Sequence, residues 1–176
     1  MESQLHKISN HESLLMAIEA TLTTLASYYL CSYVAKAYGF VMPEIAGLWG
    51  AISAIFVLNP KRTDVIHTSW MRFWGTVAGS LIPMACVYAY GGYQGYTFAS
   101  AIFITVIVVS LCRIREAYKT ACITVIVVFV IGSLKLHQIA PWVNALSRLC
   151  ESTLGIITSL IIDLVLYPIR KHFDLF

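Results

Sequence analysis

The stretch Arg72–Ile82, RFWGTVAGSLI, has a counterpart at Arg148–Ile161, RLCESTLGIITSLI. Each stretch begins with an arginine, and the two arginines are 76 positions apart in a chain of 176 residues. Both stretches open an apolar segment, so the pattern predicts helices repeated once in each half of the chain. Each has a small hydroxyl residue four positions after the arginine and a glycine seven positions after it: Thr76 and Gly79 in the first, Ser152 and Gly155 in the second.

The composition is that of a membrane protein with several spans. Hydrophobic residues make up 59% of the chain and charged residues 12%, whereas a soluble domain carries about 25% charged residues. The net charge of +3 is spread over connecting segments, which excludes a nucleic-acid-binding face. We expect a cytoplasmic N-terminal segment over residues 1–11, one membrane domain over 12–169 and a cytoplasmic tail over 170–176.

Six apolar segments follow one another, and we expect an all-α protein with six transmembrane helices. A span needs about 20 residues, so the second and fourth segments are short. Three crossings in each half would turn the second half upside down, which is the inverted-repeat architecture of many transporters. The segments are Leu14–Val34, Ile45–Leu58, Phe73–Tyr90, Tyr96–Leu111, Ala117–Leu134 and Leu146–Tyr167.

The basic residues predict an orientation in the inner (plasma) membrane. With the N-terminus in the cytoplasm, nine of the twelve lysines and arginines lie on the cytoplasmic side. Cytoplasmic loops carry an excess of Lys and Arg, so both termini are expected to be cytoplasmic. The three residues left on the outer side are Lys36, Lys135 and Arg148.

The two arginines are the first candidates for function. In this topology Arg72 begins the third span at the cytoplasmic face and Arg148 begins the sixth at the outer face, which suggests a path for anions with Thr76 beside it. Alternatively, Arg72 extends to the lipid headgroups as an anchor. Arg148 has Glu151 at i+3, so the two could form a structural ion pair or a gate whose carboxylate competes with an anionic substrate.

Small residues and carboxylates complete the candidate set. Gly75, Gly79 and Gly155 are expected to let helix backbones approach closely. Glu19 and Asp163 fall in the cytoplasmic leaflet, where a carboxylate is costly and usually faces the protein interior. Each could carry a proton or form a salt bridge with Arg72.

The remaining reactive side chains predict no enzyme and no cofactor. The five cysteines and five histidines have no metal-ligand spacing, and no serine, cysteine or histidine lies in a nucleophile motif. Trp49, in the second segment, could line a substrate route or anchor the chain at the membrane interface.

The order of these features resembles a known family. The segment GLWGAISAIFVLNPKRTDVIHTSWMRFWGTVAG, Gly47–Gly79, is similar to the membrane unit of the fusaric acid resistance and aromatic acid exporter superfamily, a group related to plant aluminium-activated malate channels. Its pattern is a tryptophan-bearing helix, a polar loop and then R-x-x-G-T-x-x-G. The sixth segment resembles the family's repeated helix, which ends in proline, here Pro168.

The resemblance implies a six-helix unit that assembles as an oligomer and moves organic anions, with aromatic carboxylates among them, out of the cytoplasm. Many members carry a large cytoplasmic domain after the helices, and this chain stops at Phe176. We therefore expect a homo-oligomer, with a dimer favoured, or gating by a separate cytoplasmic protein. The alternative is a membrane scaffold that transports nothing and binds such a partner.

Overall fold

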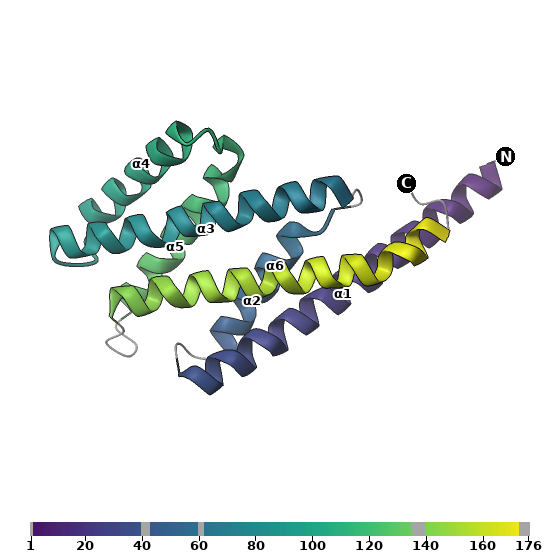
Figure 1. Cartoon of the computed structure of the whole chain (residues 1–176), viewed down its shortest axis with the longest axis horizontal. Coiled ribbons are helices and arrows are strands. Elements are labelled where there is room, and N and C mark those ends of the chain that lie inside the picture. Colours follow the sequence, from purple (N-terminus) through teal and green to yellow (C-terminus); the bar gives the residue numbers. More distant parts are fainter. Residues whose placement is uncertain (1, 40–42, 60–61, 135–139, 173–176) are drawn as a thin grey trace.

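The computed structural model describes residues 2–39, 43–59, 62–134 and 140–172. The described chain is helical and contains no strand. These residues form six α-helices and one short 3₁₀ helix, in the order α1, α2, α3, α4, η1, α5, α6. The α-helices are labelled in Figure 1. Their bounds are α1 Glu2–Tyr38, α2 Pro43–Val57, α3 Arg62–Tyr90, α4 Gly95–Leu111, η1 Arg115–Ala117, α5 Tyr118–Ser133 and α6 Pro141–His172.

The helices begin and end on residues suited to those positions. Pro43 and Pro141 are the first residues of α2 and α6, a position at which the missing N–H costs nothing. Gly39 and Gly91 follow α1 and α3 with φ of 63° and 77°, the left-handed conformation that glycine adopts without strain. The N–H of each donates to the carbonyl oxygen four residues earlier, so both helices are capped in the same way.

The two long helices α3 and α6 pack against each other at the centre of the bundle. In Figure 1, α2 crosses behind α6 and α5 crosses behind α3, and each of these pairs is closely packed. Helix α1 lies along α2 and α6, and α4 lies along α3 and α5. Helix α6 is therefore covered by α2 and α1, and α3 is covered by α5 and α4.

Four helical segments are long and apolar enough to cross a membrane: Ser13–Tyr38, Asp64–Tyr90, Arg115–Ser133 and Pro141–Pro168. Helices α2 and α4 have 15 and 17 residues, or about 22 and 25 Å of length. The six predicted segments are thus six helices. Six crossings of a bilayer about 30 Å thick stay a prediction, because α2 and α4 are shorter than that.

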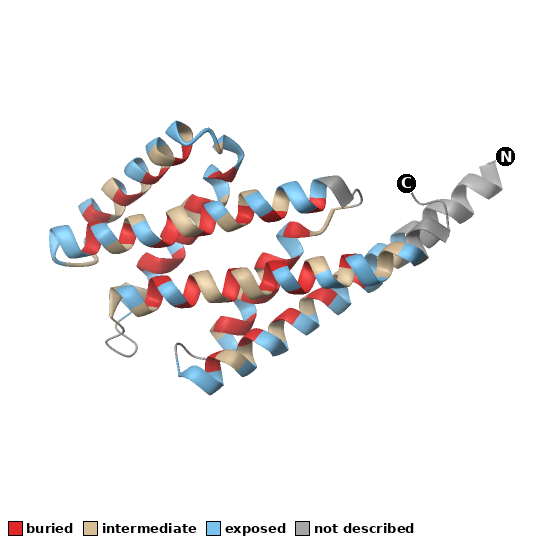
Figure 2. Cartoon of the chain, viewed as in Figure 1, coloured by how far each residue is buried: buried red, intermediate tan, exposed pale blue. Residues whose placement is uncertain are grey.

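The interior of the bundle is as polar as it is apolar. Among the described residues, nineteen buried residues are hydrophobic and nineteen are polar or charged. Large apolar side chains such as Leu22, Phe103, Leu111 and Val165 lie on the outside, and the buried positions form stripes along each helix (Figure 2). Many buried hydroxyls donate to the carbonyl oxygen one turn earlier, as Thr105 does to Ala101 at 2.6 Å. This distribution is the one expected in lipid, where an apolar exterior costs nothing.

Candidate functional site

Arg72 lies inside the bundle and not at the opening of a helix. Helix α3 begins at Arg62, ten residues before Arg72, which places the arginine about 15 Å along the helix. Only 4% of the residue is exposed. The prediction that Arg72 begins the third span was wrong, because the polar turns before it are helical too and the candidate span already starts at Asp64. The alternative in which Arg72 extends to the headgroups does not fit this burial.

The guanidinium of Arg72 is held by α2. Its Nη2 donates to Ser53 Oγ at 3.2 Å, and its Cζ lies 4.7 Å from the centre of the Phe56 ring. Its Nε and Nη1 are buried without a hydrogen-bond partner. Glu19 and Asp163 each interact with another residue, and a salt bridge from either of them to Arg72 stays a prediction.

Arg148 is equally buried on α6, and it does pair with Glu151. Its Nη2 lies 2.7 Å from each carboxylate oxygen and donates to Oε1. Its Cζ lies 5.7 Å from the centre of the Trp49 ring on α2. Like Arg72, Arg148 leaves Nε and Nη1 buried without a partner. The i+3 pairing expected from the sequence is present, and two of the three guanidinium nitrogens of Arg148 have no partner.

Both arginines line a single cavity among α2, α3, α5 and α6. Its volume is about 10 Å³, enough for the centre of about one water molecule. Ser53 lies next to it and connects the two sides, because it accepts from Arg72 and donates to Ser152 Oγ at 3.2 Å. The lining residues are Trp49, Arg72, Ile123, Thr124, Val127, Arg148 and Ser152.

The electrostatics of this cavity favour an anion. Two guanidinium charges at the cavity and the charge of Glu151, which is paired with Arg148, leave a net charge of +1. Four guanidinium nitrogen atoms, two from each arginine, have no partner. A buried cation without a partner costs several kcal/mol, and an oxygen anion between the two arginines would remove that cost. We call this arrangement the paired-arginine cavity.

The other predicted site residues lie outside the cavity. Thr76 is buried, but its hydroxyl donates to the carbonyl oxygen of Arg72 at 2.9 Å within α3. Glu19 and Asp163 are buried and each interacts with another residue. Asp163 follows Arg148 by fifteen residues, about 22 Å along α6. The structure therefore brings Arg72 and Arg148 to one cavity, with Glu151 paired to Arg148, and neither Glu19 nor Asp163 lines that cavity.

The three predicted packing glycines lie at helix crossings. A Cβ atom on Gly79 would meet the carbonyl oxygen of Ala121 and come within 2.7 Å of Thr124 Cβ on α5. A Cβ on Gly155 would meet the carbonyl oxygen of Gly50 and come within 3.0 Å of Ser53 Cβ on α2. Gly75, one turn before Gly79 on α3, packs in the same way, because a Cβ atom there would come within 2.9 Å of the carbonyl oxygen of Ala117 and of Thr120 Cβ. The glycines thus let α3 approach α5, and α6 approach α2, at the level of the cavity.

Sequence reasoning missed the part of the site that comes from α2 and α5. Ser53 and Phe56 hold Arg72, and Thr124 lines the cavity. The one signal for Ser53 was its place in a run of small residues beside Gly50. Trp49, for which the sequence left two roles open, lies in the cavity wall. The described residues contain no group of His, Cys, Asp and Glu that could hold a metal ion.

An apolar exterior, a polar helical interior and several helices of membrane-spanning length define an α-helical integral membrane protein. Residues 14–162 match the family described as "Fusaric acid resistance protein-like", and the chain belongs to this family. A protein of Bacillus cereus with the printed name "UPF0421 protein" is 25% identical over 125 residues, or 71% of this chain. The chain spans about a third of that relative's length, since the match covers 34% of it. No solved structure matches the chain.

Proposed function

We propose that this chain forms a transporter or channel for organic anions, including aromatic carboxylates, in the efflux direction. The anionic group of the substrate binds between Arg72 and Arg148. The observation that carries the proposal is the paired-arginine cavity, which is lined by two buried cations from different helices, each with two guanidinium nitrogens that have no hydrogen-bond partner. The family supports it, because it is a family of membrane transporters.

We further propose that the two halves are inverted three-helix repeats. Matched helix contacts support this: α3 packs on α5 and α4, as α6 packs on α2 and α1. Gly79 meets Ala121 and Thr124 on α5, and Gly155 meets Gly50 and Ser53 on α2. The cavity is too small for an aromatic acid, so transport needs relative movement of the repeats, which is typical of inverted-repeat transporters.

Transport is tested with Arg72→Gln. The full chain is reconstituted in proteoliposomes, and efflux of radiolabelled benzenesulfonate is measured, with benzoate as competitor. Benzenesulfonate is an aromatic anion that keeps its charge at every pH used. Loss of a charged hydrogen bond costs about 1.5–3 kcal/mol, so we expect flux to fall by roughly tenfold to a hundredfold.

Arg115→Gln is the matched control for the flux experiment. It removes the same charge from an exposed position in η1, outside the cavity, and should leave the flux at the wild-type level. Both variants are first checked by size-exclusion chromatography. If an intact Arg72→Gln assembly transports benzenesulfonate as fast as wild type, Arg72 has no part in permeation.

The proposed location is the inner membrane with both termini in the cytoplasm, and the unit is a homodimer. Cys112 tests the orientation, because it is exposed after the end of α4, whereas Cys31 and Cys86 are buried. We expect a membrane-impermeant maleimide to label Cys112 in inside-out vesicles and not in right-side-out vesicles. A Cys112→Ser variant provides the background. Labelling of Cys112 in right-side-out vesicles instead would show that the orientation is the opposite of the one proposed.

A further inference from the structure

We propose that Glu151 couples anion binding to the uptake of one proton. In the empty site its carboxylate pairs with Arg148 in place of a substrate, and it releases Arg148 when it is protonated from a second cavity between α1 and α6. The inference rests on the proposed function, since it concerns the same anion site.

The carboxylate of Glu151 lies inside the bundle, beside Arg148. Glu151 is 5% exposed, and both of its oxygens lie 2.7 Å from Arg148 Nη2. The carboxylate therefore makes the contact with a guanidinium that a substrate carboxylate would make. Arg72 Nη2 donates instead to the neutral hydroxyl of Ser53, and its Nε and Nη1 have no hydrogen-bond partner. One of the two cations is thus already neutralised, and a substrate must compete for it.

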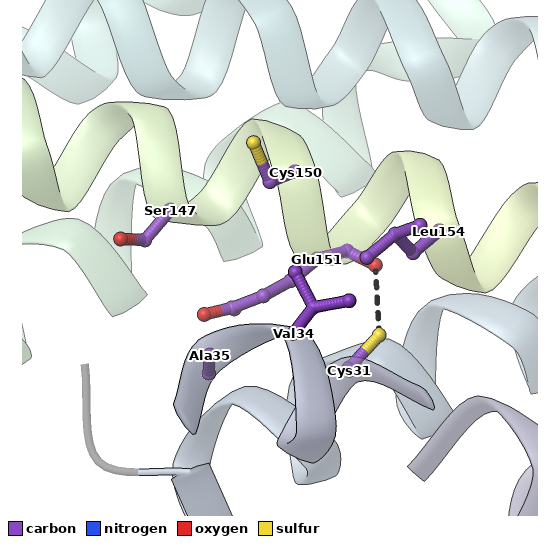
Figure 3. Close-up of a pocket in the computed structure, with 7 residues that line it drawn as sticks. All are labelled: Cys31, Val34, Ala35, Ser147, Cys150, Glu151 and Leu154. Carbon is purple, nitrogen blue, oxygen red and sulfur yellow. Dashed lines mark hydrogen bonds between the residues drawn. The ribbon is translucent and has the colours of Figure 1, made fainter. Parts of the chain in front are cut away.

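A second cavity lies between α1 and α6, and Glu151 is one of its lining residues (Figure 3). Its volume is also about 10 Å³. Ser147 Oγ, one turn before Glu151, is buried at its wall without a hydrogen-bond partner. The lining residues are Cys31, Val34, Ala35, Ser147, Cys150, Glu151 and Leu154.

The two cavities share no lining residue. Arg148 lines the paired-arginine cavity and Glu151 lines the second one. The Arg148–Glu151 ion pair is therefore the contact that joins the two spaces. A proton that reaches Glu151 from the second cavity changes the charge available to an anion in the first, without passing through the anion site.

The charged and titratable groups around Glu151 come from three helices, α6, α1 and α3. On α6 it faces Arg148 and Cys150, and on α1 Cys31, whose Sγ donates to the carbonyl oxygen of Glu151 at 3.7 Å. Across the paired-arginine cavity lies Arg72 on α3. Within the described part of the chain, Glu151 is the one carboxylate in this group. Protonation of Glu151 is therefore the change that frees Arg148.

The charges balance in this exchange. Before binding, two arginines and one carboxylate give the site a net charge of +1. An anion displaces the carboxylate from Arg148, a proton neutralises the carboxylate, and the net charge is again +1. If no proton entered, Glu151 would remain buried as an anion without its partner, which costs several kcal/mol. One proton should therefore enter for each monovalent anion bound.

The test measures benzenesulfonate binding to the full chain in nanodiscs by titration calorimetry between pH 6 and pH 8. Two buffers of different ionisation enthalpy are used, so that bound protons are counted directly. We expect wild type to take up as much as one proton per anion, and its affinity to rise by up to about tenfold for each unit by which the pH falls. Glu151→Gln should take up none and bind equally well at every pH.

Glu44→Gln removes an exposed carboxylate from α2 and is the matched control, with wild-type proton uptake expected. Wild-type binding without proton uptake, or undiminished uptake by Glu151→Gln, would overturn the coupling and leave the anion site standing. Absence of binding at every pH would instead overturn the proposed function. If Glu151→Gln does not fold, the proton count of wild type still decides the question.

Discussion

Replacing Arg148 by methionine should destabilise the protein by about 3–5 kcal/mol, because Glu151 would remain buried without its partner. The pair lies inside the bundle, with both side chains almost fully covered. For a chain of this size the loss corresponds to a fall in Tm of roughly 10 °C. Thermal unfolding of the purified protein in a mild detergent measures it.

The double variant Arg148→Met/Glu151→Met is the control for this experiment. Replacement of a whole buried ion pair by apolar residues is often neutral or stabilising, so its Tm should return close to that of wild type. Together with wild type and Glu151→Met, the two variants form a double-mutant cycle that isolates the coupling between the two side chains. Equal losses in the single and double variants would show that the ion pair is not what stabilises this region.

The second large effect is expected at the glycine crossings. Gly79→Ala adds one carbon atom, which would meet the carbonyl oxygen of Ala121 and the Cβ of Thr124. The backbone of α5 must move away, and we expect a loss of about 2–3 kcal/mol, measured as the fall in Tm in the same detergent. Gly155→Ala should have a similar cost, because it meets the carbonyl oxygen of Gly50.

Gly95→Ala is the matched control for these two variants. It makes the same chemical change at a helical glycine, the first residue of α4, where a Cβ meets nothing within 4 Å. Its Tm should stay close to that of wild type or rise slightly, since alanine favours helix over glycine. A Tm for Gly79→Ala equal to that of Gly95→Ala would contradict the close approach of α3 and α5.

Local patterns in the sequence predicted much of the fold. Six apolar segments became six helices, because an apolar run of that length has to satisfy its backbone groups internally in lipid. The start of α3 was missed by about ten residues. Hydropathy reports which residues contact lipid, whereas Arg62–Met71 is a polar helical extension that hydropathy does not detect.

The sequence predicted the site residues only where a pattern within one helix identifies them. The repeated arginine, hydroxyl and glycine pattern identified Arg72 and Arg148, and the i+3 spacing identified Glu151. Ser53 and Phe56 come from α2, and their contacts with Arg72 depend on how two helices cross, which no spacing within one segment encodes. For the same reason the sequence could not show that Glu19 and Asp163 do not line the paired-arginine cavity.

The polar interior also determines how the stability of this protein depends on temperature. Unfolding of a soluble domain transfers a hydrocarbon core into water, and that transfer raises the heat capacity. Here many leucines and isoleucines already lie on the outside of the bundle, and the groups released from the inside include many hydroxyls and charged side chains. Exposed polar surface lowers the heat capacity, so the two contributions oppose each other. The unfolding enthalpy should consequently change little between a cold and a warm membrane.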